Sequence, residues 1–253
     1  MPGLAALPAE QIAALLAVTL LGGTLRGFAG FGSSLLIVPA VGLMLGPRVA
    51  VVIGTLLEAL ATAMLVPSSL AHMGHRRVWT MGLASCVAIP LGHLSLLALN
   101  PAVSNVASSA AVVVMTVLVW RGAMPALGAQ RRADVGVGLV SGFLTGFGSI
   151  GGPPRVLYFL ADPRAAVYKR ADIIGVSGIA QAAAIVSMLG FGLLTLSGAG
   201  DAALLAPVFF GGGMLGSRLF RRASDRTYQR VAIAALFVAA TTLLGVNVAR
   251  IAL

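Results

Sequence analysis

Two short passages, Gly30-Phe31-Gly32-Ser33 and Gly146-Phe147-Gly148-Ser149, decide how this chain of 253 residues folds. They repeat one tetrapeptide at an offset of 116 residues, and Pro47-Arg48 recurs as Pro163-Arg164 at the same offset. Two matches that share one offset without a gap indicate an internal duplication. We therefore expect two structural repeats that meet at their glycine-rich passages.

The composition places these repeats in a membrane. Hydrophobic residues make up 58% of the chain and charged residues 9%, whereas a soluble domain carries about 25% charged residues. So few charges cannot cover a surface in water. The net charge of +10 is typical of basic cytoplasmic loops, and we expect no nucleic-acid partner because no basic domain lies outside the apolar segments. With Cys86 as the single cysteine and no spaced set of His and carboxylate residues, we expect no metal and no cofactor.

Apolar segments of about 20 residues, the length that crosses a bilayer, define the membrane helices. Six segments qualify or nearly so: 49–70, 78–99, 102–120, 173–196, 202–220 and 231–249. Shorter apolar pieces flank the glycine passages, at 12–25 and 35–45 around the first and at 135–147 and 156–161 around the second. Such interrupted helices are either thin, tilted spans or the arms of a re-entrant pair. The sequence thus predicts an all-α integral membrane protein.

The basic residues predict an orientation. Thirteen of the seventeen Lys and Arg residues lie in four connections, at 76–77, 121–132, 164–170 and 218–230, whereas the connections 100–105 and 197–201 contain none. Because Arg and Lys are retained on the cytoplasmic side, the four basic connections should face the cytoplasm together. An even number of crossings must then separate Asp134 from Arg164, so the two short pieces between them form a pair.

Equivalent connections of the two repeats differ in charge. The basic connection at 76–77 corresponds to the uncharged one near Asp201, and the uncharged one at Asn100 corresponds to the basic one near Asp225. The repeats, residues 1–125 and 126–253, are therefore expected to be inverted, with an odd number of crossings each and both termini outside the cytoplasm. Inverted repeats with broken helices at matching positions are typical of secondary transporters, whose binding sites lie near the membrane midplane.

The glycine passages favour an anion as the ligand. Glycines let consecutive N–H groups turn inward and form an anion-binding nest at a helix N-terminus. Serine hydroxyls, two bordering arginines and one amide add donors. The candidate binding residues are Arg26, Gly30, Gly32, Ser33, Ser34, Gly148, Ser149, Gly151, Gly152, Arg155 and Gln181. The alternatives are close helix packing for the glycines, snorkelling to an interface for the two arginines and a bridge between helices for the amide.

Two titratable residues inside the spans, Glu58 and His93, are candidates for ion coupling. An ionised carboxylate in mid-span is costly without a partner, so Glu58 either pairs with an arginine or carries a coupled proton. His93 is either a hydrogen-bonded packing residue or a proton relay.

The duplicated glycine motif, Pro39 in the apolar run after its first copy, and Gly151-Gly152-Pro153 after its second resemble the TauE/SafE family of sulfite exporters over nearly the whole chain. The first motif differs from the family's usual three glycines, because Ser33-Ser34 stands there. The resemblance implies a multi-pass permease of a bacterial-type inner membrane, with the lipid bilayer and a small sulfur-containing anion as its partners. The resemblance is also compatible with a homo-oligomer.

We therefore predict a secondary transporter that exports sulfite or an organosulfonate by alternating access between the repeats, and no enzymatic activity. Membrane potential can drive such export, since 100 mV acts on one charge with about 2.3 kcal/mol. One alternative is an anion channel. Another is an intramembrane hydrolase that uses Ser33, Ser34 or Ser149 as nucleophile with His93 as base.

Overall fold

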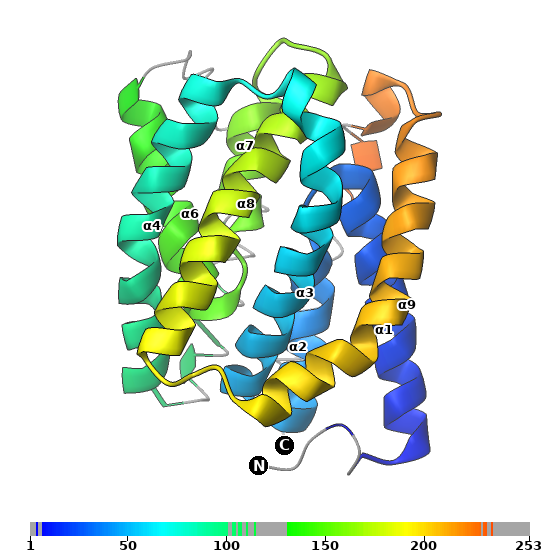
Figure 1. Cartoon of the computed structure of the whole chain (residues 1–253), viewed down its shortest axis with the longest axis vertical. Helices are drawn as coiled ribbons and strands as arrows, with labels where there is room; N and C mark the ends of the chain where they lie inside the picture. Colours follow the sequence, from blue (N-terminus) through cyan, green and yellow to red (C-terminus); the bar gives the residue numbers. More distant parts are fainter. Residues whose placement is uncertain are drawn as a thin grey trace.

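The computed structural model in Figure 1 describes residues 7–100 and 131–228, with isolated positions at 4, 103–104, 106–107, 110, 114, 230–231 and 234. Within these residues the chain is helical and contains no strand. Five of the described helices are long and apolar enough to cross a membrane: α1 (Ala9–Ala29), α3 (Pro47–Ser69), α4 (His75–Ala98), α8 (Ala166–Gly190) and α9 (Leu196–Phe220). Most of the predicted spans 102–120 and 231–249 lies outside the described residues.

Three shorter helices complete the order: α2 (Ser33–Leu45), α6 (Arg131–Gly148) and α7 (Gly152–Leu160), with a 3-10 turn, η2 (Leu70–His72), between α3 and α4. At a rise of 1.5 Å per residue, α2 is about 20 Å long and α7 about 14 Å, both less than the roughly 30 Å of hydrocarbon. The chain therefore repeats one order of helices: α1 to α4 have the same succession of one broken pair and two long helices as α6 to α9.

The first predicted piece, 12–25, is too short, because α1 continues past it to Ala29. The apolar run stops at Arg26, but the helix does not, because Arg26 is buried with its charge paired inside the protein. Likewise α8 begins at Ala166 rather than 173, and its polar first turns contain Arg170 and Asp172, which have partners on neighbouring elements. Charged residues with internal partners extend both helices beyond the apolar segment.

The two glycine passages are the points where the helices break. Gly30 and Gly32 have φ of +82° and +98° between α1 and α2, a left-handed conformation that glycine adopts without a steric cost. Between α6 and α7, Ser149 has φ of +54°, which costs a residue with a side chain roughly 1–2 kcal/mol. The tight turns let each short helix reverse against the helix before it.

Glycines also bring two pairs of helices into backbone contact, α1 with α9 and α4 with α6, which lie side by side in Figure 1. A Cβ atom at Gly27 of α1 would overlap the backbone of Gly213 in α9, and one at Gly142 of α6 would overlap the backbone of Ser85 in α4. Small residues permit this close approach between membrane helices. Each pair joins a helix from the first half of the chain to one from the second.

An ionic network joins α4, α6 and the connection between α7 and α8. Arg77, in the first turn of α4, pairs with Asp134 at the start of α6 (3.5 Å) and with Asp162 after α7 (2.5 Å). Arg164 pairs with Asp162 (2.9 Å) and with Asp172 in α8 (2.5 Å). The start of α6 and the end of α7 therefore lie at the same end of the molecule, as the predicted pairing of these two helices requires.

The remaining basic connection lies at this same end. The Asp225 carboxylate accepts a hydrogen bond from the Ala166 amide (3.0 Å), and the Arg170 guanidinium lies 4.4 Å from the centre of the Phe220 ring. At the opposite end the Leu4 amide donates to Asp201 (3.0 Å), at the start of α9. In Figure 1, α1 and α6 run in opposite directions, and so do α3 and α8. We call the end that contains Arg77, Arg164 and Asp225 the basic end.

Two adjacent glycines of α9 test the backbone contact with α1. Gly212→Ala should lower stability by about 1–3 kcal/mol, the usual cost of overpacking, because the added Cβ would overlap the Leu20 carbonyl oxygen. Gly211→Ala is the matched control, because a Cβ there meets nothing within 4 Å, and alanine favours a helix. Thermal unfolding of both variants in one detergent measures the difference. Equal unfolding midpoints would contradict the contact.

The ionic network predicts a dependence of stability on pH. Burial by itself would raise the pKa of Asp162. The hydrogen bonds from Arg164 and Arg77 outweigh this effect and lower the pKa to about 2. A carboxyl group whose pKa is lowered by folding stabilises the protein above its unfolded pKa, near 3.8, and that contribution is lost as pH falls toward 2. Asp162→Asn should therefore unfold at a lower temperature than the wild type near neutral pH. The gap between their midpoints should close between about pH 4 and pH 2, and a gap that does not change with pH would disprove this role.

Candidate functional site

Helices α3 and α8 pack against each other at the centre of the protein and face each other with polar side chains. On α3, Thr55, Glu58 and Thr62 recur at the spacing of one helix face, and on α8 Ser177 and Gln181 are four residues apart. All five side chains are buried. A polar face inside an apolar protein requires partners for its groups. Residues at the two glycine passages supply most of them, and Gln181 Oε1 has no partner among the described residues.

The Glu58 carboxylate lies at the N-terminus of α2. Its Oε1 atom accepts hydrogen bonds from the hydroxyls of Ser33 (2.9 Å) and Ser34 (3.0 Å), and a longer one from the Ser34 amide (3.4 Å). Its Oε2 atom accepts from Gln181 Nε2 (2.9 Å) and lies 3.7 Å from Arg26 Nη1. The positive end of the α2 dipole adds to the stabilisation of the carboxylate. The predicted anion nest is thus occupied by an anion of the chain itself.

Arg26 ties the end of α1 to this carboxylate. Its Nη1 donates to the Gly30 carbonyl oxygen (2.7 Å), and its Nη2 donates to the hydroxyl of Thr62. The Nε atom, although buried, has no hydrogen-bond partner among the described residues. With 1% of its surface exposed, Arg26 is part of the protein interior, so it does not snorkel to an interface.

Arg155, at the second glycine passage, is as deeply buried as Arg26, at 1% exposed. Its guanidinium donates to the Gly151 carbonyl oxygen (2.8 Å), to the Ser177 hydroxyl (2.8 Å) and, at 3.5 Å, to Thr145 Oγ1. No described carboxylate lies within ion-pair distance of it. The site therefore contains two guanidinium groups and one carboxylate, a net charge of +1.

The other residues of the second passage contact α3, α6 and the first passage. Thr55 donates a hydrogen bond to the Ser149 hydroxyl (3.3 Å), so both passages contact the same face of α3. A Cβ at Gly151 would overlap Thr145, and one at Gly152 would touch Phe31 of the first passage (3.5 Å). The other two candidates, Gly32 and Gly148, can contribute only backbone groups. Gly32 directly precedes α2, and Gly148 is the last residue of α6 and is buried.

His93 lies outside this polar site, where α4 contacts α8. Its Nδ1 atom lies 2.8 Å from the Ser187 hydroxyl on α8, and its Nε2 atom has no partner in the described part of the chain. The hydroxyls of Ser33 and Ser34 donate to Glu58 instead, and the hydroxyl of Ser149 accepts from Thr55. The pairing of one of these serines with His93, on which the hydrolase hypothesis depends, is therefore not formed in the described structure.

Sequence reasoning missed five residues of the site, all small hydroxyl residues: Thr55, Thr62, Ser141, Thr145 and Ser177. Each lies three or four positions from another polar residue on its own helix, for example Ser141 from Thr145. That spacing is the signal that could have identified them. It is weak, because Ser and Thr also satisfy their hydroxyls within their own helix.

The Arg26–Glu58 pair predicts non-additive effects of mutation. Glu58→Leu should lower the free energy of unfolding by about 3–5 kcal/mol, because it leaves a buried arginine without its counter-charge. Adding Arg26→Met should recover part of that loss, since both charges are then removed. Glu10→Leu, at the chain's other, exposed glutamate, should change stability little. Additive losses in the double variant, measured by unfolding in detergent, would show that the two side chains do not interact.

Comparison with known proteins gives one result. The family described as sulfite exporter TauE/SafE matches residues 15–243, nearly the whole chain. Comparisons with curated proteins and with solved structures give no match. The matched region includes both glycine passages, α1 from its third turn onward and all of α2 to α9. A match of this extent shows that the chain belongs to the TauE/SafE family of sulfite exporters.

Proposed function

We propose that the protein is a secondary transporter that exports sulfite or an organosulfonate, which binds between the two glycine passages. The observation that carries this proposal is the buried guanidinium of Arg155, which no described carboxylate neutralises. Nearby, the Glu58 carboxylate already accepts hydrogen bonds from serine hydroxyls, a backbone amide and an amide side chain and pairs with Arg26. Sulfite and sulfonate groups offer acceptor oxygens of the same kind, so surroundings of this type suit them.

The charge of the site supports an anionic substrate. Burying an unpaired charge is costly, because the protein interior solvates it poorly. Arg155 contributes such a charge beside the Arg26–Glu58 pair, and one bound monoanion would neutralise it. We therefore assign Arg155 as the principal cation for the substrate, with Ser149 and Ser177 beside it as hydroxyl groups that can turn toward a ligand.

The family membership supports transport, and the packing supports alternating access. Opposite directions of α1 and α6, and of α3 and α8 (Figure 1), are what two inverted repeats, residues 1–125 and 126–253, require. We propose that the substrate site lies between these repeats, with α2 and α7 as the re-entrant arms. The basic end would face the cytoplasm of a bacterial-type inner membrane, since Arg and Lys collect there, and the N-terminus would lie outside.

Two driving forces are compatible with this site. If the substrate binds beside Arg155 and Glu58 stays ionised, net negative charge moves outward. A potential of 100 mV then supplies about 2.3 kcal/mol, which corresponds to a gradient of roughly 40-fold. If the substrate instead replaces Glu58 at the N-terminus of α2, the carboxylate must take up a proton. We propose the first route, because it leaves the Arg26–Glu58 pair intact.

Transport in proteoliposomes tests the function. Wild-type protein should exchange labelled sulfite faster when unlabelled sulfite is present on the other side, as a carrier does, whereas an anion channel shows no such stimulation. Arg155→Met should bind sulfite at least tenfold more weakly, since a charge-assisted hydrogen bond contributes about 1.5–3 kcal/mol. Arg76→Ala is the control, because Arg76 is exposed at the basic end. Unchanged transport by Arg155→Met would contradict the assigned site.

The same vesicles separate the two driving forces. With the potential clamped and the pH gradient varied, wild-type export should follow the potential, and Glu58→Gln should keep that dependence. Export that follows only the pH gradient in the wild type, and loses this dependence in Glu58→Gln, would assign proton coupling to Glu58.

A further inference from the structure

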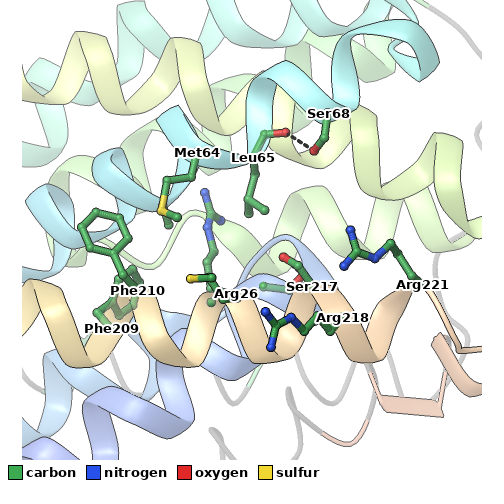
Figure 2. Close-up of a pocket in the computed structure, with 13 residues that line it drawn as sticks. Arg26, Met64, Leu65, Ser68, Phe209, Phe210, Ser217, Arg218 and Arg221 are labelled. Atoms are coloured by element: carbon green, nitrogen blue, oxygen red, sulfur yellow. Dashed lines mark hydrogen bonds between the residues drawn. The ribbon is translucent and has the colours of Figure 1, made fainter.

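A cavity of about 300 Å³ lies between α1, α3 and α9, next to the central site (Figure 2). Arg26 forms its inner wall, and Arg218 and Arg221 of the α9 end line it toward the basic end. Figure 2 shows Met64 and Phe210 toward one end of the cavity and Arg221 toward the other, with Arg26 between them. The cavity thus joins the basic end of the protein to a side chain of the central site.

The lining of the cavity is positive. It includes three arginines and no carboxylate, and of the three only Arg26 has an ion-pair partner among the described residues, Glu58. The side chains of Arg218 in the last turn of α9 and of Arg221 directly after it, three residues apart, make no ion pair or hydrogen bond with any residue that the structure describes. The third, Arg26, is buried and has its Nε atom unpartnered within the described residues. An anion is the ligand that such a lining attracts.

The other walls are apolar. Met64 and Leu65 of α3 face Phe209, Phe210 and Met214 of α9 across the cavity. A volume of about 300 Å³ is that of a small-molecule site and roughly ten times the volume of one water molecule in the liquid. Sulfite consists only of sulfur and its oxygens, so it would fill a small part of this space and would leave the apolar walls without a partner.

We infer that this cavity is a second anion site, specific for sulfonates that carry an apolar group. The inference rests on the proposed transport function, of which it specifies the substrate class. The sulfonate lies between Arg218 and Arg221, and the apolar group packs against Met64, Phe210 and Met214. Arg26, which lines this cavity and also contacts Glu58, connects it to the central site. Substrate thus enters from the basic end and is selected for its apolar part before it reaches Arg155.

A chain-length series tests this site by binding alone. Methanesulfonate, butanesulfonate and hexanesulfonate are titrated against the protein in nanodiscs of zwitterionic lipid. Affinity should rise about fourfold for each methylene group that enters the cavity, the equivalent of about 0.8 kcal/mol. The double variant R218A/R221A should bind hexanesulfonate at least tenfold more weakly, Phe210→Ala should weaken the dependence on chain length, and Arg76→Ala should bind as the wild type does.

Binding that does not depend on chain length, or that is unchanged in R218A/R221A, would overturn the inference. An anionic lipid headgroup offers a similar charge, so a second set of nanodiscs contains phosphatidylglycerol. Stabilisation of the wild type but not of R218A/R221A by that lipid, without binding of hexanesulfonate in zwitterionic discs, would assign the cavity to lipid and also overturn it.

Arg155→Met separates this inference from the proposed function. The variant keeps every residue that lines the cavity, so its binding of hexanesulfonate should still depend on chain length and on Arg218 and Arg221, whereas its binding of sulfite should be weakened. A wild-type protein that binds hexanesulfonate in this way but carries no anion in proteoliposomes would refute the transport function and leave the site standing. Sulfite transport without any binding of longer sulfonates would refute the site and leave the function standing.

Discussion

The carboxylate of Glu58, buried in the middle of α3, is the constraint on which the rest of the site depends. A charge in that position is tolerated only with partners around it, and they come from four elements: Arg26 from α1, Ser33 and Ser34 from α2, Gln181 from α8, and Thr62 from its own helix through Arg26. Each partner fixes the position of its own backbone. The break after α1 must place α2 with its first turn toward α3, which explains why Gly30 and Gly32 are in the left-handed region.

The second half of the chain builds a related but different arrangement. Its broken pair also reaches α3, through Ser149 and Thr55, yet its arginine lies after the break rather than before it, and it contributes no acid. Among the described residues, Arg155 is held by a carbonyl and by hydroxyls. The site thus contains one cation paired with a carboxylate, Arg26, and one cation, Arg155, without a carboxylate partner in the described part of the chain, and this difference is the reason we propose an anion from solution as its ligand.

Much of this arrangement follows from the sequence, and the limits have physical causes. Apolar length predicted α3 and α4 to within three residues at each end, because their ends coincide with the ends of the apolar runs. It failed for α1 and α8, where Arg26, Arg170 and Asp172 lie inside the helix with partners that only the folded chain brings near. The serines of the first glycine passage do lie against a negative charge, but it is the charge of Glu58, and the binding of a substrate anion by the two passages stays a prediction. That the nearest anion is Glu58 could not be predicted, since no local pattern relates positions 33 and 58.

The backbone contacts made by glycines have a consequence for how such a protein can move. Surfaces in which a Cα meets a carbonyl leave no side chains that could change rotamer and let one helix slide along the other. Helix α1 is therefore bound to α9, and α4 to α6, across the boundary of the sequence repeats. A rigid unit that moved during a transport cycle would then contain helices from both halves of the chain. Each of the two glycine-packed pairs has one member from either half, and α3 and α8 lie between the pairs (Figure 1).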